Sequence, residues 1–390
     1  MESKTADLRG EMRAWRRDIH KHPELGFREL RTAAKVADLL TDFGLEVHGG
    51  IGTTGVVGVL RRGQGNRAIG LRADMDALPI QEANDFPHRS VNDKVFHGCG
   101  HDGHTAMLLG AARRLAEDGD FDGTVYFIFQ PSEEDGRGAL SMIDDGLFER
   151  FPMEAVYGLH NMPGIPAGHF AVRKGAMMTS EDIFVITIQG RGGHASMPDR
   201  TVDPVVIGAE VVLALQTIVS RSVGPQDWGV VSVTEMLTDG ARNVIPSRVT
   251  IKGDCRALTP ETQGRIEARM RQIVAGICAA HGAQGNVDYR QDFVVTVNTP
   301  AETEAAVAAA RQVAGAPAVD ADCPTCGGSE DFARMLRKKP GCYILIGNGL
   351  EGHCGSSLHN PHYDLNDEIL GAGRDYWVAL VEAQLPSRHP

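Results

Sequence analysis

The sequence lacks several features that would each indicate a class of protein. It has no run of basic residues, and its formal net charge is -12, which argues against a nucleic-acid surface because phosphate binding needs clustered Lys and Arg. No stretch approaches the ~20 apolar residues that span a membrane, and the N-terminus lacks the apolar core of a secretory signal. No internal repeat or low-complexity segment is visible. We therefore expect a cytoplasmic protein that binds neither nucleic acid nor a membrane.

The sequence has few cysteines, seven in 390 residues, and their number is odd. In a chain without a secretory signal this pattern indicates reduced thiols. Cys323 and Cys326 have the spacing of a redox or zinc pair, and Cys342 and Cys354 follow. A structural zinc site would need all four cysteines to converge, and nothing in the sequence requires that. We expect free thiols in loops.

The chain is long enough for two domains, or for one domain with an insertion. Its first 180 residues alternate helical and extended patterns. The expected strands are 56–60, 68–72, 124–129 and 155–159, and the expected helices are 28–43, 105–116 and 138–145. Strands separated by helices indicate an α/β fold with a mostly parallel sheet covered on both faces.

Residues 181–295 follow a different order. Their pattern is strand, helix, strand, strand, helix and strand, at 183–190, 202–220, 229–237, 247–256, 261–280 and 286–293. This βαββαβ order is the ferredoxin-like unit. Helix and strand patterns resume from about residue 296. We therefore expect a larger domain of residues 1–180 and 296–390, interrupted by an inserted domain of residues 181–295.

Polar side chains follow several strands expected in the larger domain. Asp74 follows one strand, Glu133 and Glu134 another, and His160 a third. Sites in open α/β sheets are built at the carboxyl ends of strands. Adjacent glutamates usually belong to a solvated acidic loop. A lone histidine after an apolar run more often has a structural role than a role as a ligand. A hydrolase can also use such a pair, with one carboxylate as a metal ligand and the other as a general base.

The segment HGCGHDGHTA, residues 97–106, places Cys99 and His101 two positions apart. Its glycines indicate a loop, and in an extended loop residues i and i+2 point to the same side, so thiolate and imidazole could share one metal ion. Two other interpretations stay open for this fragment. It could be a loop cysteine beside surface histidines, or a Cys99 nucleophile activated by His101 and oriented by Asp102.

A further loop ahead of the last helix adds imidazoles. They are His353, His359 and His362. Each of these polar signals is weak alone. Together, Cys, His and Glu residues at four ends of strands or loops form the mixed ligand set that zinc, manganese or cobalt accept.

Eight motifs then occur in an order that resembles a known family. They are RADMDALP (72–79), HGCGHDGHTAMLLGAA (97–112), FQPSEE (129–134), GLHNMP (158–163), GRGGHASMPDRTVDPV (190–205), NVIPS (243–247), GSEDFA (328–333) and LHNPHYDLND (358–367). The chain closely resembles the dinuclear metallo-amidohydrolases that include hippurate hydrolase, bacterial N-acyl-amino-acid amidohydrolases and plant auxin-conjugate hydrolases. The resemblance covers nearly the whole chain. It implies a catalytic domain interrupted by a smaller dimerisation or lid domain.

The resemblance also implies two divalent metal ions per chain, which could be manganese, zinc, cobalt or nickel. The implied ligands are Cys99, His101, Glu134, His160 and His359. The Cys99 thiolate would bridge the two ions, which would enforce its deprotonation. Glu133 would be the general base, and Asp76 would fix a ligand imidazole through its other nitrogen. No ligand role is implied for His97, Asp102 or His104.

Three positions in the inserted domain also match the family's motifs. His194 would donate to the oxyanion of the tetrahedral intermediate. Asn243 and Arg256 would hold the substrate, and Arg256 suits the carboxylate of an amino-acid product. From the residues alone, these three would be a loop histidine, a turn residue and an exposed strand residue.

The implied activity is metal-dependent hydrolysis of N-acyl amino acids to a carboxylic acid and a free amino acid, by a homodimer that pairs through residues 181–295. Three alternatives stay open. One is a hydrolase or deaminase of another small amide or amine on the same scaffold. Another is a ligand-binding relative without turnover, which would be free to lose Glu133. The third is a metal-independent cysteine hydrolase that uses Cys99.

Overall fold

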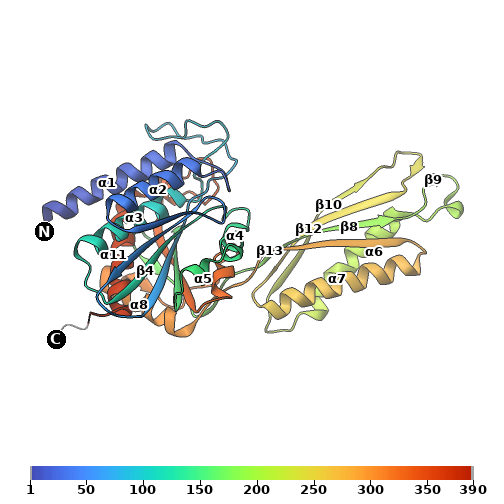
Figure 1. The fold of residues 1–390 in the computed structure, drawn as a ribbon. Helices are drawn as coiled ribbons and strands as arrows, with labels where there is room; N and C mark the ends of the chain where they lie inside the picture. The colour runs from blue at the N-terminus through green and yellow to red at the C-terminus, as the bar shows by residue number, and fades with distance from the viewer. Residues whose placement is uncertain (1, 388–390) are drawn as a thin grey trace. The chain divides into compact units, whose positions relative to one another are not determined.

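The computed structural model describes residues 2–387, with side chains from Leu8 onward, and divides into two compact units. The large unit comprises Met1–Met177, Thr296–Thr325 and Asp331–Pro390. The inserted unit comprises Met178–Val295 and a short stretch, Cys326–Glu330, which the sequence pattern did not place there. Figure 1 shows the elements of both units.

The large unit is built on an eight-stranded sheet of order β1-β2-β4-β3-β5-β16-β6-β15. Its strands are β1 (Glu46–Ile51), β2 (Gly55–Arg62), β3 (Ala68–Asp74), β4 (Gly123–Gln130), β5 (Ala155–Pro163), β6 (Phe170–Ala171), β15 (Val319–Asp320) and β16 (Gly341–Gly349). The central strands β4, β3, β5 and β16 are parallel, and β1 and β2 add antiparallel strands at one edge. Every residue of β3 is buried, as expected for a parallel strand covered on both faces. The predicted mostly parallel α/β fold is confirmed.

Helices pack around this sheet, and α1, α2, α3, α8 and α11 form one core with it. They are α1 (Glu2–Lys21), α2 (Leu30–Asp42), α3 (His101–Asp118), α4 (Gly138–Asp144), α5 (Leu147–Arg150), α8 (Pro300–Ala314), α9 (Ala333–Leu336), α10 (Gly352–Gly355) and α11 (Leu370–Gln384). Short 3-10 turns occur at Ala316–Ala318 and Asp367–Ile369. Helix α1 was not predicted from the sequence, although Leu8, Met12, Trp15 and Ile19 are buried at helical spacing.

The start of α3 differs from the prediction. The glycines of residues 97–106 predict a loop, with a helix only from residue 105, but α3 begins at His101. Gly100 precedes it in a left-handed conformation, with φ of +89°. Gly103 lies inside the helix, where an added Cβ would come within 2.1 Å of the Leu365 side chain. This glycine therefore serves close packing rather than a turn.

The inserted unit has the βαββαβ order predicted from the sequence. Its elements are β8 (Glu181–Gln189), α6 (Pro204–Thr217), β10 (Gly229–Thr238), β12 (Arg248–Ala257), α7 (Pro260–Ala280) and β13 (Gln284–Phe293). The strands form an antiparallel sheet of order β10-β12-β8-β13, which confirms the ferredoxin-like unit. Alternate residues of β8 are buried, and Figure 1 shows α6 and α7 along one face of the sheet.

Smaller elements complete the two units. In the inserted unit β9 (Gly193–His194) pairs with β11 (Val244–Ile245), and short helical turns occur at Pro198–Arg200 and Ile218–Ser222. A second small pair joins β7 (Gly175–Met178) to β14 (Thr296–Asn298).

One helical segment contradicts the expectation that no stretch has the length and composition to cross a membrane. The segment Pro204–Ser222 has 19 residues and is long and apolar enough to cross a membrane, by length and composition alone. Its most apolar window is 28% buried. Its buried face carries Ile207, Val211 and Leu215, which belong to the core of the inserted unit. The helix therefore has a packing role in this unit while apolar side chains on its other face stay exposed.

A buried carboxylate in the inserted unit has an unusual protonation equilibrium. Asp182 is 1% exposed and accepts hydrogen bonds from the Tyr289 hydroxyl at 2.7 Å and from Gln263 Nε2 at 2.6 Å. Burial raises the pKa of Asp182 to about 6, because the two hydrogen bonds only partly offset the loss of hydration.

We predict that Asp182 makes the inserted unit less stable as the pH rises. Its pKa is higher in the folded protein than the value of about 4 in an unfolded chain, so the folded state binds more protons between pH 4 and 6. The contribution of protonated Asp182 to the free energy of unfolding is therefore present at low pH and is lost as the pH rises through about 6. Asp182→Asn should remove this dependence, which amounts to about 1–3 kcal/mol. Unfolding curves of both proteins from pH 4 to 7 measure it, and parallel pH profiles would contradict the prediction.

Candidate metal centre

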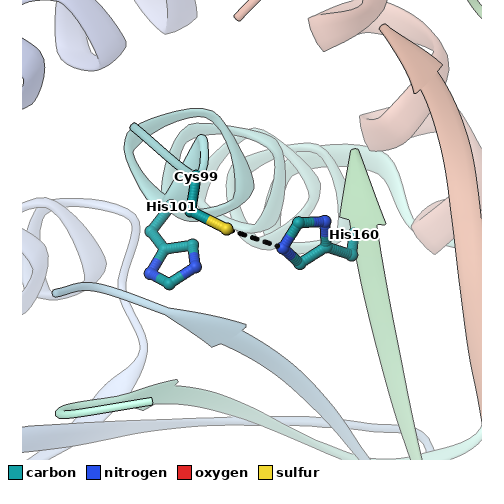
Figure 2. A group of neighbouring side chains, drawn as sticks. All are labelled: Cys99, His101 and His160. Carbon is teal, nitrogen blue, oxygen red and sulfur yellow. Dashed lines mark hydrogen bonds between the residues drawn. The ribbon is translucent and has the colours of Figure 1, made fainter. Parts of the chain in front are cut away.

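The predicted ligands come from four segments of the large unit. His101 is the first residue of α3, and the left-handed Gly100 separates it from Cys99. Glu134 follows β4, His160 lies in β5, and His359 lies in the loop before α11. Because β4 and β5 flank β3 in parallel, their carboxyl ends lie at the same edge of the sheet. Figure 2 shows the Cys99 Sγ atom facing His160 Nε2, at 3.4 Å, beside the His101 ring.

These side chains form two groups that share one residue. Cys99, His101 and His160 form the first group, and Cys99, Glu134 and His359 the second. Within each group the ligand atoms lie within 4.8 Å of one another. The structure thus brings together all five side chains that the resemblance implied, with the thiol common to both groups.

Unpartnered atoms face the same region. Among the described residues, the buried atoms His101 Nε2 and Glu134 Oε1 have no hydrogen-bond partner. Glu134 Oε1 lies 3.9 Å from His101 Nε2 and 3.5 Å from His359 Nε2. A buried polar atom without a partner is costly and calls for an explanation such as a bound ion. Thiolate, imidazole and carboxylate ligands fit a divalent transition metal.

Hydrogen bonds orient the imidazoles toward this region. His101 Nδ1 contacts the carbonyl oxygen of Asp76 at 2.9 Å and its carboxylate at 3.2 Å. The other carboxylate oxygen of Asp76 accepts from the Glu134 backbone N–H at 3.0 Å. His160 Nδ1 bonds the Asn161 carbonyl at 2.5 Å. Both rings therefore direct Nε2 toward the ligand groups, the usual arrangement for a metal-binding histidine.

The Cys99 thiol requires a cation to ionise. Burial raises its pKa well above the ordinary value, and the carboxylates of Glu134, Glu133 and Asp74 raise it further. The thiolate that a nucleophile or a metal ligand needs is therefore unfavourable in the metal-free protein. Divalent ions at this position would reverse the balance.

The geometry also argues against the cysteine-nucleophile interpretation. Asp102 does not orient His101, because it pairs with Arg16 at 2.8 Å and with His20 at 2.8 Å. The Nδ1 atom of His101 is bonded to Asp76 instead. The relay from Asp102 through His101 to Cys99 that this alternative requires is thus not formed.

His104 and His97 are buried but lie outside the two groups. His104 has both nitrogens engaged, with Nδ1 on Asp74 at 2.7 Å and Nε2 accepting the Asn161 backbone N–H at 2.9 Å. Asp74 in turn pairs with Arg72 at 2.6 Å. Although Asp74, His101 and His104 also approach within 4.8 Å of one another, these bonds occupy the ligand atoms of His104.

Glu133 lies beside the ligand groups on the turn after β4. It is 6% exposed, it approaches His101 and Glu134 within 4.8 Å, and its Oε1 accepts from the Asp331 backbone N–H at 3.4 Å.

The residue before Glu133, Ser132, has a left-handed φ of +48°, and its N–H donates to the buried Glu29 at 2.9 Å. No role was predicted for Glu29 or Asp331 from the sequence. Asp331 lies in the quoted motif GSEDFA, whereas Glu29 has no signal beyond its position before α2.

The remaining predicted site residues belong to the inserted unit. His194 is exposed, and its Nδ1 accepts from the Ser196 backbone N–H at 3.2 Å. The pairing of β9 with β11 places His194 opposite Val244, next to Asn243. Arg256 forms ion pairs with Glu181 at 2.9 Å and Asp254 at 3.0 Å. These carboxylates already neutralise the guanidinium that was expected to bind a substrate carboxylate.

All seven cysteines are free. The expectation of loop positions is wrong for two of the four downstream cysteines. Cys342 is buried in β16 and Cys354 lies in α10, whereas Cys323 and Cys326 lie between regular elements. None of these four belongs to a metal-binding group formed by the described residues.

We predict that Cys99→Ala removes most bound metal, because Cys99 belongs to both ligand groups. The matched control is Cys326→Ser, which alters a half-buried thiol outside those groups and should leave the metal content unchanged. Elemental analysis of both variants, purified alongside the unaltered protein without chelator, measures the effect. Equal metal content in all three proteins would show that Cys99 is not a ligand.

Comparison with known proteins agrees with this site. Residues 70–383 match the model of peptidase family M20/M25/M40. The chain is 42% identical over 375 residues to the hippurate hydrolase of Campylobacter jejuni, covering 96% of this chain and 97% of that protein. It is 38% identical over 378 residues to the IAA-amino acid hydrolase ILR1-like 2 of Arabidopsis thaliana, covering 96% and 85%.

A solved structure extends the comparison to the fold. The YXEP protein of Bacillus subtilis, described as a dinuclear metal binding peptidase from the M20 family, matches with a TM-score of 0.85 and 30% identity. The match covers 98% of this chain and 99% of that one. The chain therefore belongs to the peptidase family M20/M25/M40 and is a hydrolase.

Proposed function

We propose that this hydrolase cleaves the amide bond of N-acyl amino acids, releasing a carboxylic acid and a free amino acid. The observation that carries the proposal is the pair of ligand groups sharing Cys99, with the carboxylate of Glu133 beside them. The names of two relatives, hippurate hydrolase and IAA-amino acid hydrolase, both describe hydrolysis of an acylated amino acid. That shared chemistry supports the substrate class, and it leaves the acyl group open.

Each ligand group would hold one divalent ion, with the Cys99 sulfur shared between them. Manganese, zinc, cobalt and nickel all accept such mixed sulfur, nitrogen and oxygen donors. Bound there, a pair of ions supplies Lewis acidity, which lowers the pKa of water and polarises an amide carbonyl.

Glu133 is the general base in this proposal. It accepts a proton from the water whose oxygen forms the new bond to the acyl carbon, and it gives that proton to the amine nitrogen as the C–N bond breaks. Its contact with the Asp331 backbone N–H orients one carboxylate oxygen. The Glu134 backbone N–H donates to Asp76, which fixes this part of the turn. Among the described residues, the buried Glu134 Oε1 has no hydrogen-bond partner, so this oxygen is available as a ligand.

The inserted unit supplies the remaining proposed roles. His194 stabilises the oxyanion, and Asn243 beside it contacts the substrate. Arg256 binds the amino-acid carboxylate, and for this it must exchange one of its ion pairs with Glu181 or Asp254. This requirement makes Arg256 the most demanding of the proposed roles.

We also propose that the protein is a homodimer that pairs through residues 181–295, in the cytoplasm. Val206 and Leu213 on α6 are 58% and 73% exposed, and an apolar helix face of this kind supports an interface. On the edge strand β10, Met236 and Leu237 are also exposed. The free state of all seven cysteines fits a reducing compartment.

The substrate proposal is tested by a hydrolysis screen on metal-reconstituted protein. The compounds are benzoyl, acetyl and indole-acetyl amino acids, each matched with the same amide lacking the carboxylate. We expect release of free amino acid from at least one carboxylate-bearing compound and much slower hydrolysis of its matched amide. Turnover of the carboxylate-free amides alone, or release of ammonia from amines, would favour a different substrate on this scaffold.

Adjacent glutamates give the sharpest test of the mechanism. Glu133→Gln keeps the shape of the side chain and removes the base, so turnover should fall by at least ~10²-fold. Metal occupancy should stay close to that of the unaltered protein. Glu134→Gln should instead lose metal, because Glu134 is the proposed ligand. Activity assays and elemental analysis of both variants decide, and exchanged phenotypes would reverse the two assignments.

The resemblance further implies that His194 serves the active site of the partner subunit, and we propose that it does. Glu133→Ala and His194→Ala proteins, each inactive, are unfolded together in equal amounts and refolded. Random pairing gives about half mixed dimers, and each mixed dimer has one intact site if His194 acts in trans. Activity should then recover to about one quarter of that of the unaltered protein. No recovery, with mixed dimers confirmed by mass, would contradict the shared site.

A further inference from the structure

Asn161 connects three segments that each carry an expected ligand. It follows His160 at the end of β5 and is fully buried. Its Nδ2 donates to the carbonyl oxygen of Cys99 at 2.6 Å, and its Oδ1 accepts from the Tyr363 hydroxyl at 2.7 Å. Tyr363 lies in the same loop as His359. One amide side chain therefore joins the Cys99 loop, β5 and the His359 loop.

The orientation of this amide is determined by its partners. The carbonyl oxygen of Cys99 can only accept a hydrogen bond, so the NH₂ group of Asn161 must face it. The Tyr363 hydroxyl then donates to the amide oxygen. An aspartate has the same size but would place a second acceptor against the Cys99 carbonyl.

The backbone of Asn161 positions the neighbouring ligand. Its carbonyl oxygen bonds His160 Nδ1 at 2.5 Å, which leaves His160 Nε2 facing Cys99 Sγ at 3.4 Å. Its N–H donates to His104 Nε2 at 2.9 Å, and this bond fixes the backbone at the end of β5. The residue thus holds both the Cys99 loop and the His160 ring.

Gly100 allows this close approach. Its φ is +89°, and an added Cβ would lie 2.3 Å from Asn161 Nδ2 and 2.4 Å from the Tyr363 hydroxyl oxygen. Only a residue without Cβ can follow Cys99 while the amide and the hydroxyl keep their positions. The Gly100 backbone, the Asn161 amide and the Tyr363 hydroxyl therefore pack against one another next to the ligand groups.

We propose that Asn161 is a positioning residue that sets the spacing between the Cys99 sulfur and the His160 nitrogen for metal binding. Asn161 forms no hydrogen bond with Cys99 Sγ or His160 Nε2. It acts through the Cys99 carbonyl oxygen and the Nδ1 atom of the His160 ring. The proposal rests on the proposed metal centre. It adds a determinant of metal affinity that no ligand motif assigns.

The test compares two buried amides by Co²⁺ titration of metal-free protein. Asn161→Asp should weaken Co²⁺ binding at least about tenfold, the lower end for loss of a residue that supports a ligand, and should alter the thiolate-to-cobalt absorption band. The matched control is Asn298→Asp. Asn298 is also buried and donates to two backbone carbonyls, those of Arg173 and Tyr343, but it contacts no expected ligand. It should retain the affinity and the band.

Unfolding curves of the metal-free variants confirm that each is folded. If Asn161→Asp does not fold, Asn161→Ala removes the side-chain bonds to Cys99 and Tyr363 and the 3.0 Å contact of Nδ2 with His104 Nε2, without placing an acceptor against Cys99. The same loss is expected. A folded Asn161 variant with unchanged affinity and an unchanged thiolate band would overturn the proposal. An equal loss in Asn298→Asp would overturn it as well, since the effect would then follow from any buried amide.

The outcome for the unaltered protein separates this inference from the function on which it rests. If the unaltered protein and the Asn161 variant both bind Co²⁺ with the same affinity and the same thiolate band, only the role of Asn161 is contradicted. Unaltered protein that binds no Co²⁺, or binds it without a thiolate band, contradicts the proposed metal centre itself.

Discussion

The Cys99 thiol is buried among carboxylates, and this contact governs the chemistry of the site. Burial and the negative charges of Glu134, Glu133 and Asp74 all raise its pKa, so the sulfur stays protonated unless positive charge is brought to it. His101, in the same group, shows the complementary effect. Burial alone would lower its pKa, but Asp74, Asp76 and Glu134 raise it to about 10. The metal-free protein thus holds protons where divalent ions would bind, and the fold presents the ligands already assembled.

Buried charges behind the ligands are paired, and this pairing supports the assembly. Arg72 bridges Asp74 at 2.6 Å and Asp331 at 3.1 Å, and so connects the strand behind the imidazoles to the loop that contacts Glu133. Arg16 binds Asp102 directly after His101. Such buried cations are costly to remove, because each would leave buried carboxylates without their guanidinium partner. The rigidity of the ligand set therefore depends on residues that never face a substrate.

Much of this arrangement could be predicted from the sequence because it follows from local patterns. Apolar runs and the strand-end rule located Glu133, Glu134 and His160, and the alternation of strand and helix gave the inserted ferredoxin-like unit. The roles of Cys99 as a shared ligand and of Glu133 as a base came from family resemblance, since the residues alone left a loop cysteine and a cysteine nucleophile open.

The rest depends on contacts between distant segments, which a local pattern does not contain. The glycines around Cys99 are typical of a loop, but Gly103 lies in a helix, where the absence of a Cβ allows Leu365 to pack against it. Asn161 lies in the motif GLHNMP, but the motif did not indicate its role because its partners, Cys99 and Tyr363, lie 62 and 202 residues away in the chain. The ion pairs of Arg256 with Glu181 and Asp254 were likewise invisible, and they change what that residue must do to bind a carboxylate.

Anomalous diffraction from crystals of zinc-loaded protein decides whether the Cys99 sulfur serves two ions. We expect two anomalous peaks per chain, each about 2.3 Å from the Cys99 sulfur, the usual zinc–thiolate distance. One peak should also contact His101 and His160, and the other Glu134 and His359. A single peak, or two peaks of which either lies beyond bonding distance of Cys99, would contradict it.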